Sequence, residues 1–387
     1  MKIFFSVGEP SGDQHAAHLI QELRRRHPEL DCCGFGGPLM EQAGCDLLYR
    51  LTDLAVMGFA RVIPMLGKFL RLVKVAERSF RGAPPDAVVL VDFPGFNWWI
   101  ARKAKAAGIP VFYYLPPQLW AWAPWRIKRV RRFVDHVLCA LPFEYDWYVK
   151  QGVSAYYVGH PFFDEVADRP LDRAFLHWWS SGDARLVAVL PGSRQHELTH
   201  NWPLMLEIMQ RVHARHSHVR FLVACYREQH QNLCRQRAEA QAPDLPIEFF
   251  VGKTSEIIEL AECALMVSGS VSLEMLARRT PAVVLYHVGW TTFFLARHLI
   301  NCHYMSLPNL MAEYEVLPEY PAVGRSNAEI GQISDRLNGW LARPELLQAV
   351  RKDLDDLRDR FARTGATARA TEILLSRIDA RRQRRAA

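Results

Sequence analysis

Short runs of apolar, β-branched and aromatic residues alternate with helical patterns along most of this 387-residue chain. In the first half the runs are 2–7, 87–92, 111–116, 136–141 and 155–160. Strands that are apolar at nearly every position and separated by helices are typical of parallel sheets covered on both faces. The order then restarts, with runs at 185–190, 220–226, 247–251, 265–269 and 282–288. The sequence therefore predicts an α/β fold of two Rossmann-like, doubly wound parallel-sheet domains.

The length of the chain agrees with two domains of ordinary size. We expect a first domain over 1–165, a linker over 166–184 that contains Pro170 and Gly182, and a second domain over 185–344. Residues 345–387 show only helical patterns. They are predicted to pack back on the first domain or on a partner chain, so a homodimer is possible.

Composition narrows the class of protein. No apolar run reaches the roughly 18 residues needed to cross a bilayer, which favours a cytoplasmic protein. The eight cysteines form no C-x-x-C pair and are expected to be reduced, buried thiols. The net charge of +7 favours anionic partners such as nucleic acid, anionic lipid or a phosphorylated substrate.

The loop GEPSGD at 8–13 joins the first predicted strand to a helix. It is not a dinucleotide-binding G-x-G-x-x-G loop, and Glu9 and Asp13 would repel a pyrophosphate. We expect it to meet the hydroxyls of a sugar-like group, with Asp13 capping the helix. The alternative is a cap and turn that binds no ligand.

Two loops in the second half are suited to a nucleotide. In 190–198, Gly192 and Ser193 allow close backbone approach and Arg194 presents a rigid fork of donors to a diphosphate. In 268–276, amides near Gly269 and Ser270 can receive phosphate, while Glu274 can take ribose hydroxyls. The alternatives are a surface turn with a solvated arginine and a helix turn stabilised by its own side chains.

Asp92 ends a predicted strand, where a partly desolvated carboxylate can take a proton from a substrate hydroxyl. It is the candidate general base; its alternative role is to cap the helix that starts near Phe96. Residues 57–75 form a basic amphipathic segment that can lie at a membrane surface or cover the core. The stretch 120–132 interleaves tryptophans with cations, which suits an acyl chain and phosphate or stacked bases.

Ten segments identify a family by their order and spacing. They are GEPSGD at 8, MGF at 57, DFPGFN at 92, PQLWAW at 117, LPFE at 141, GHP at 159, LPGSR at 190, SGS at 268 with its following glutamate, LPNL at 307 and LPE at 317. Together they resemble lipid-A-disaccharide synthases, which are glycosyltransferases of the two-domain GT-B type.

The resemblance implies that UDP-2,3-diacylglucosamine is joined to 2,3-diacylglucosamine 1-phosphate, with inversion, to give a β-1,6 disaccharide and UDP. It implies Asp92 as base and Arg194 at the diphosphate, with no cofactor, no metal and no nucleic acid. The expected donor residues are Gly192, Ser193, Gly269, Ser270, Glu274, Asn309 and Glu319. The expected acceptor residues are Glu9, Ser11, Gly12, Asp13 and Met57. Acyl chains on both substrates imply peripheral binding to the inner membrane through Phe59, Met65, Phe69 and Arg71.

The chain departs from the family pattern at 115–117, 311–315 and 320–322, which bears on donor binding and acyl-chain preference. Two other functions stay open at this point. One is a UDP-sugar 2-epimerase of the same fold, which would also carry a phosphate-binding arginine. The other is a non-catalytic protein that binds anionic lipid or RNA, for which Asp92 would be dispensable.

Overall fold

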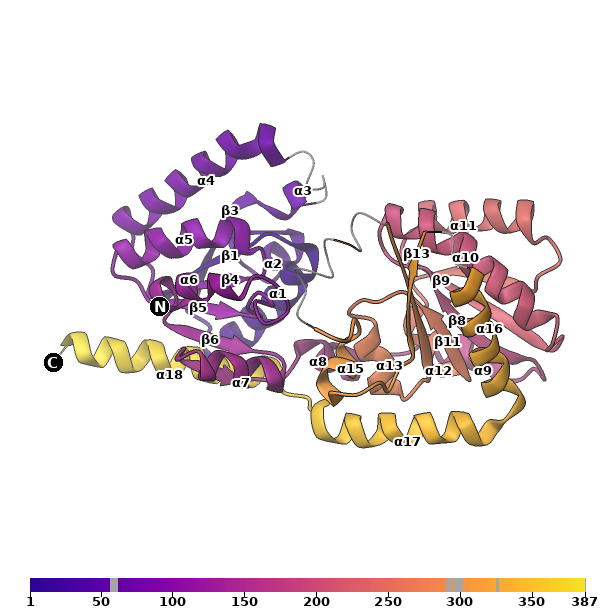
Figure 1. Ribbon diagram of the computed structural model, residues 1–387. Coiled ribbons are helices and arrows are strands. Elements are labelled where there is room, and N and C mark those ends of the chain that lie inside the picture. The colour runs from indigo at the N-terminus through magenta and orange to yellow at the C-terminus, as the bar shows by residue number, and fades with distance from the viewer. Residues whose placement is uncertain (56–61, 290–293, 295–301, 325–326, 387) are drawn as a thin grey trace. The chain divides into compact units, whose positions relative to one another are not determined.

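The computed structural model divides the chain into two compact units, Met1–Asp164 with Thr364–Ala387, and Glu165–Arg363. It describes residues 1–55, 62–289, 294, 302–324 and 327–386, without the side chains of 62–65 and 385–386. Each unit contains one parallel sheet, of seven strands in the first and six in the second (Figure 1). The predicted fold class, two doubly wound parallel α/β domains, is confirmed.

The sheet of the first unit has the order β3-β2-β1-β4-β5-β6-β7. Its strands are β1 (Lys2–Val7), β2 (Asp31–Gly36), β3 (Asp46–Arg50), β4 (Ala87–Val91), β5 (Val111–Tyr114), β6 (His136–Cys139) and β7 (Ala155–Tyr157). Their parallel register places the carboxyl ends of β1, β4, β5 and β6 side by side. Side chains that follow these strands therefore gather at one edge of the sheet, where ligands bind in this class of fold.

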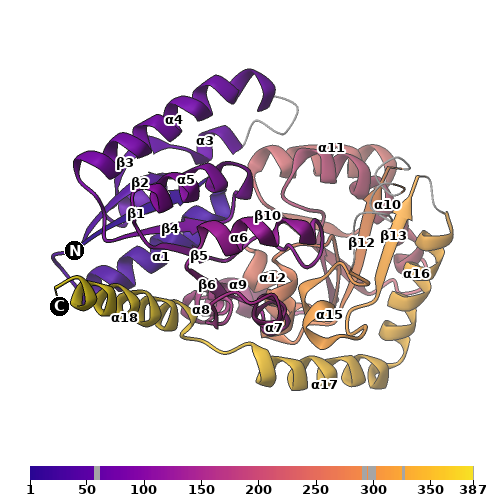
Figure 2. The ribbon, with the colours of Figure 1, turned by 60° about the vertical axis from the view of Figure 1, so that its left-hand side comes forward.

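Helices cover both faces of this sheet (Figures 1 and 2). They are α1 (Pro10–Arg26), α2 (Pro38–Gln42), α3 (Thr52–Ala55), α4 (Val62–Gly82), α5 (Pro94–Ala106), the short 3-10 helix η2 (Pro124–Arg126), α6 (Ile127–Phe133) and α7 (Pro142–Lys150). One buried cluster joins Phe4 and Leu90 of the strands to Val73 of α4 and Ile100 of α5. Because side chains alternate along a strand, the other face receives α1, which also packs against the last helix of the chain.

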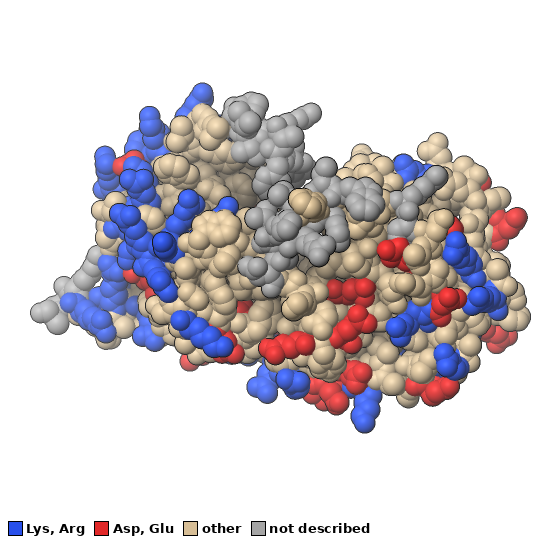
Figure 3. Space-filling view, viewed as in Figure 1, with Lys and Arg blue, Asp and Glu red and all other residues tan. Residues whose placement is uncertain are grey.

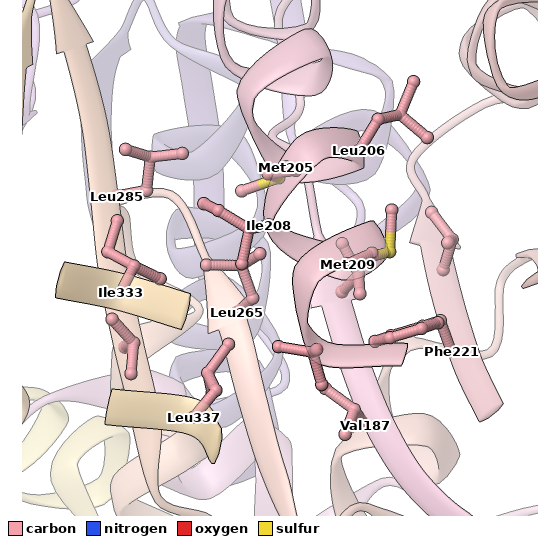
Figure 4. Packing of buried hydrophobic residues seen from close by; sticks show 14 of the residues in the cluster. Val187, Met205, Leu206, Ile208, Met209, Phe221, Leu265, Leu285, Ile333 and Leu337 are labelled. Carbon is pink, nitrogen blue, oxygen red and sulfur yellow. The ribbon is translucent and has the colours of Figure 1, made fainter. Parts of the chain in front are cut away.

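The sheet of the second unit has the order β10-β9-β8-β11-β12-β13. Its strands are β8 (Arg185–Leu190), β9 (Val219–Cys225), β10 (Ile247–Val251), β11 (Cys263–Met266), β12 (Ala282–Val288) and β13 (Glu319–Val323). The helices that follow its first strand are α10 (Gln195–His213), α11 (Glu228–Gln241), α12 (Thr254–Leu260), α13 (Ser272–Arg278), α15 (Leu307–Ala312), α16 (Asn327–Ala342) and α17 (Pro344–Phe361). Figure 4 shows Met205, Ile208 and Met209 of α10 packing against Leu265 and Leu285 of the sheet.

The segment predicted as a linker is largely helical. It contains the end of α8 (Pro161–Asp168) and all of α9 (Arg173–Ser180), whose N-cap, Asp172, accepts the amides of Ala174 and Phe175 at 3.0 and 3.1 Å. Helix α9 packs on α12, so it belongs to the second unit.

The C-terminal helices differ from the prediction that 345–387 packs as one set. Helix α17 packs on α13, α15 and α16 in the second unit, and only α18 (Ala366–Ala386) returns to the first. Asp164 caps α18 by accepting the amides of Gly365 and Thr367 at 2.5 and 2.9 Å. Near its end, Arg382 pairs with Asp86 at 2.8 Å, which ties the terminal arginine-rich stretch to the body of the unit.

Candidate functional site

Asp92 follows β4 in a strained turn. Both Asp92 and Phe93 adopt left-handed backbone conformations, with φ of 45° and 43°. Neither is glycine, so the conformation costs energy and must be held by its surroundings. The side-chain amide of Asn97 donates to the carbonyl of Asp92 at 2.8 Å, and the hydroxyl of Tyr113 donates to the same oxygen at 2.7 Å. This turn sits at the edge of the sheet where the sequence places the base.

The glycines of the GEPSGD loop make room for this turn. A Cβ atom on Gly8 would lie 2.3 Å from the ring of Phe93, and one on Gly12 would lie 3.2 Å from a carboxylate oxygen of Asp92. A contact of 2.3 Å is far inside van der Waals distance, so a side chain at residue 8 would displace Phe93. The loop after β1 and the turn after β4 therefore pack directly against each other, and the glycines of the first loop are needed for this contact.

The environment of the Asp92 carboxyl group alters its acidity. Burial, together with the negative charge of Glu9, raises the pKa of Asp92 to about 7, against a smaller opposing effect of His15. The N-cap of α5 is Phe93, which makes no side-chain cap hydrogen bond. Asp92 is therefore not the N-cap of this helix, and that alternative is wrong. A carboxyl group with a pKa near neutrality is suited to exchange a proton with a substrate hydroxyl.

Asp13 corrects one detail of the sequence interpretation. It does not cap its own helix, because it lies inside α1 and its carboxylate accepts the amides of Gly37, Leu39 and Met40 at 2.9, 3.0 and 3.1 Å. The side chain is buried, and it anchors the start of α2. Glu9 is half-buried and Ser11 is exposed at the start of α1, while Met57 lies outside the described residues.

Glu144, in the LPFE segment, was not predicted as a site residue. It lies in the first turn of α7, is only 3% exposed, and accepts the indole N–H of Trp120 at 3.4 Å and the amide of Ala140 at 3.3 Å. Burial raises the pKa of Glu144 to about 8, and the negative charge of Asp92 contributes to the rise. The sequence signal was a glutamate two residues after an apolar strand and its Leu-Pro, at the same edge as Asp92.

In the second unit, Arg194 is the N-cap of α10 and its side chain is 70% exposed. Its partner is Glu197, which the sequence analysis did not single out. Glu197 accepts the amides of Ser193 and Arg194 at 3.1 and 3.2 Å and pairs with the Arg194 guanidinium at 3.0 Å. Gly192 has φ of 111°, and a Cβ there would lie 2.6 Å from a Glu197 carboxylate oxygen. The amides of Ser193 and Arg194 thus donate to Glu197. The donors that this loop exposes to solvent are those of the Arg194 guanidinium.

The loop after β11 contains the exposed residues Gly269 and Ser270 and is followed by α13. Glu274 is 3% exposed and accepts the guanidinium Nε of Arg278 at 3.0 Å, one turn further along the helix. Ser268 donates to the carbonyl of Met305 at 2.9 Å. The loop is therefore tied at its start to the segment that leads into α15.

Asn309 and Glu319 form a closed polar network in that segment. The amide of Asn309 donates to Leu317 and Glu319 at 2.7 and 2.8 Å and accepts from the amides of Val316 and Leu317, both at 2.8 Å. Glu319 also accepts from the amide and hydroxyl of Ser306 at 2.8 and 2.6 Å. Both side chains thus have several hydrogen-bond partners within the protein, and these bonds fix the conformation of the segment 305–319.

The predicted membrane residues separate into two groups. Phe69 is half-buried, with its ring centroid 6.2 Å from that of Phe93 and 5.5 Å from that of Phe96, so it packs inward. Arg71 is exposed. Phe59 and the side chain of Met65 lie outside the described part of the chain. Leu66 and Leu70, which were not predicted, are 54% and 52% exposed on α4.

Among the described residues, no group of three or more histidine, cysteine, aspartate or glutamate side chains is placed to hold a metal ion. Over the same part of the chain, no helix combines the length and the apolar composition that a membrane crossing requires.

Comparison with proteins of known structure bears on the fold. A UDP-GlcNAc 2-epimerase from Neisseria meningitidis, solved with UDP-GlcNAc bound, superposes with a TM-score of 0.66 over 97% of this chain and 100% of that one, at 11% sequence identity. MurG from Acinetobacter baumannii superposes with a TM-score of 0.59 over 97% and 99% of the two chains, at 14% identity. At such low identity these likenesses establish the shared fold alone.

Comparison of sequences identifies the family. The lipid-A-disaccharide synthase of Idiomarina loihiensis is 34% identical over 370 residues, which cover 93% of this chain and 92% of that protein. The enzyme of the same name from Myxococcus xanthus is 35% identical over 378 residues, or 97% of both chains. The model of the family described as lipid-A-disaccharide synthetase matches residues 3–338. The chain therefore belongs to the lipid-A-disaccharide synthetase family.

Proposed function

We propose that this protein transfers a 2,3-diacylglucosamine group from UDP to the 6-hydroxyl of 2,3-diacylglucosamine 1-phosphate, with inversion, to form a β-1,6 disaccharide and free UDP. Family membership over most of the chain supports the reaction class. The observation that carries the mechanism is the Asp92 turn, where a carboxyl group with a pKa of about 7 is presented at the ligand edge of the first sheet.

In this proposal Asp92 takes the proton of the acceptor hydroxyl as its oxygen attacks the anomeric carbon. The new carbon–oxygen bond forms as the bond to UDP breaks, and a single displacement of this kind inverts the centre. A base with a pKa near the operating pH is partly unprotonated in the free enzyme and can still hold the proton it receives. Glu9 contributes by keeping the pKa of Asp92 high.

The second unit holds the donor in this proposal. The Arg194 guanidinium is exposed and faces the diphosphate, whose negative charge grows as the sugar departs. In this proposal the amides of the exposed residues Gly269 and Ser270 donate to a phosphate oxygen, and Glu274 lies near the ribose. Asn309 and Glu319 act by holding the 305–317 segment against the loop at 268, through the bond from Ser268 to Met305.

The test is to incubate the purified protein with both substrates, with and without added magnesium, and to detect UDP and the disaccharide by mass spectrometry. Product that requires both substrates is expected from a transferase, whereas an epimerase would convert a UDP-sugar alone. Asp92→Asn should abolish disaccharide formation while UDP binding, measured by calorimetry, is unchanged. Normal turnover by this variant would exclude Asp92 as the base.

We further propose that α4 binds the inner membrane from the cytoplasmic side. Leu66 and Leu70 are more than half exposed on this helix, and the exposed cations Lys68, Arg71 and Lys74 flank them. Figure 3 shows lysine and arginine side chains gathered over this part of the first unit. Apolar side chains with adjacent cations are typical of helices that lie on anionic bilayers.

Liposome flotation with phosphatidylglycerol vesicles tests this surface. Leu66→Ser with Leu70→Ser should weaken binding several-fold in a protein that still folds, because the apolar contacts are lost. Leu48→Ser, at an exposed leucine of β3 in the same unit, is the control and should leave binding unchanged. If the wild type, the double variant and the Leu48→Ser control bound the vesicles equally, the leucines of α4 would not contribute to membrane binding.

A further inference from the structure

Trp120 is held from one side by helix α7. Its indole N–H donates to Glu144 at 3.4 Å, and its ring meets Phe143 edge to face, with centroids 4.7 Å apart and an interplanar angle of 88°. The other oxygen of Glu144 accepts the amide of Ala140 at 3.3 Å, so the carboxylate itself is fixed. Trp120 remains half-buried, with part of its surface open to solvent.

The loop that carries Trp120 is strained at both ends. Leu115 and Ala123 have φ of 52° and 60°, although neither is glycine. A third contact with α7 fixes the loop between them, since the hydroxyl of Tyr148 donates to the carbonyl of Pro117 at 2.9 Å. Strained backbone that is held by several independent contacts is typical of functional sites. The contacts with α7 therefore hold the indole in one orientation.

The position of this loop is next to Asp92. The loop follows β5, Glu144 follows β6, and Asp92 follows β4, and these three strands are neighbours in the parallel sheet. The charge of Asp92 contributes to the raised pKa of Glu144, so the two carboxyl groups lie within electrostatic reach of each other. The Trp120 loop and the Asp92 turn therefore follow neighbouring strands at one edge of the sheet, and we expect a ligand whose hydroxyl approaches Asp92 to reach this loop.

We propose that Trp120 forms the surface against which the ring of the acceptor sugar packs, and that Glu144 is the positioning residue that fixes the plane of the indole. A gluco-configured pyranose ring carries axial C–H groups, and an apolar ring face made of them is complementary to the face of an indole. Glu144 is buried at the N–H edge of the indole and acts through it. This inference rests on the proposed function, because it assigns the first unit to the acceptor.

The test measures the KM of each substrate in four variants. Trp120→Leu removes the aromatic surface and should raise the acceptor KM about tenfold, while the donor KM stays within about twofold. Glu144→Ala should raise the acceptor KM several-fold. Glu144→Gln keeps one oxygen for the indole N–H but turns its NH2 group toward the amide of Ala140, so its acceptor KM should lie between those of the wild type and Glu144→Ala. The double variant Trp120→Leu with Glu144→Ala should be no worse than Trp120→Leu, because Glu144 acts through the indole.

The matched control is Trp178→Leu, at a tryptophan of α9 that is 77% exposed in the second unit, and it should leave both KM values unchanged. Circular dichroism confirms folding, and if Glu144→Ala does not fold, Trp120→Leu and Glu144→Gln still carry the test. An unchanged acceptor KM in Trp120→Leu, equal rises in both KM values, or additive effects in the double variant would overturn the inference. A wild-type protein that makes no disaccharide would instead contradict the proposed function.

Discussion

The side-chain amide of Asn97 lies 2.8 Å from the main-chain carbonyl of Asp92, to which it donates a hydrogen bond from one turn into the following helix. The same amide also donates to the carbonyl of Val91 at 3.1 Å, while its oxygen accepts the hydroxyl of Ser6 at 2.7 Å. Asn97 is fully buried. It therefore joins β1, the end of β4 and α5, and holds the left-handed turn that presents the Asp92 carboxyl group.

Asn97→Ala should lower both stability and activity. It leaves the carbonyls of the turn and the buried hydroxyl of Ser6 without this partner, so the free energy of unfolding should fall by about 2 to 3 kcal/mol. The turn that it holds is strained, so kcat should fall more than the KM of either substrate rises. Urea denaturation and steady-state kinetics measure the two effects.

The control for this change is Asn232→Ala, at an exposed position of α11. Its free energy of unfolding should remain within about 0.5 kcal/mol of the wild type. If the Asn97→Ala protein had wild-type stability and wild-type kcat, the turn at Asp92 would keep its conformation without the hydrogen bonds of Asn97.

The activity should depend on the protonation of Asp92. Its pKa is raised to about 7, first by burial and then by Glu9, and a general base must be unprotonated to act. The value of kcat/KM should therefore rise with pH and level off above about 7. Glu9→Gln removes a like charge, so the pH at which kcat/KM reaches half of its maximum should fall. If this pH were the same in Glu9→Gln and in the wild type, the charge of Glu9 would not be a cause of the raised pKa of Asp92.

The same shift has a consequence for stability, with a definite sign. The unfolded carboxyl group loses its proton near pH 3.9, whereas the folded one keeps it to about 7. Between these values the folded state binds the extra proton, so the contribution of Asp92 to stability falls as pH rises. Asp92→Asn should thus be more stable than the wild type at pH 8, by about 1 to 3 kcal/mol, but not at pH 4. If Asp92→Asn and the wild type were equally stable at pH 8, the Asp92 carboxylate would be more accessible to water than its raised pKa implies.

The sequence predicted strands best where apolar residues run without a break. Eight of the ten predicted runs agree with the observed strands to within two residues at both ends, and four of them, such as 185–190, agree at both ends. It did not predict β2, β3 or β13. Strand β2 reads DCCGFG, with two glycines, and β3 is a short edge strand that begins and ends with an exposed charged residue. Strand β13 contains Pro321, which a strand tolerates because β13 lies at the edge of its sheet.

Site residues were harder to interpret, because a carboxylate or amide in a loop has the same sequence signature whether it binds a ligand or the backbone. Asp13 belongs to a glycine-containing motif, yet its oxygens accept three amides from a segment 24 to 27 residues further along the chain. Asp92 also follows a strand next to a glycine-containing motif, but there burial and the charge of Glu9 raise the pKa of the carboxyl group. The difference depends on which backbone amides the fold brings near each carboxylate, and no local pattern specifies that.

Glu197 should control donor binding through Arg194. Glu197→Ala removes the acceptor of two amides and of the guanidinium, so the loop at 192–194 should lose its fixed shape. The donor KM should rise about tenfold with little change in the acceptor KM, and the loss of the capping box should cost about 1 kcal/mol of stability. Glu207→Ala, at a half-exposed glutamate of the same helix, is the control. Equal changes in the KM values of donor and acceptor would show that Glu197 has no specific effect on donor binding.

Glu319 should matter more for the stability of the second unit than for direct contact with a substrate. Glu319→Gln replaces one oxygen by a donor, and that donor would face either the amide of Met305, at 2.6 Å, or the three donors from Ser306 and Asn309. Two donors in opposition leave a buried group unpaired, so the free energy of unfolding should fall by about 1 to 3 kcal/mol. Glu315→Gln, at an exposed position nearby, should be neutral. If Glu319→Gln instead kept wild-type stability but lost affinity for UDP in calorimetry, the glutamate would be a direct donor contact, as the family resemblance implied.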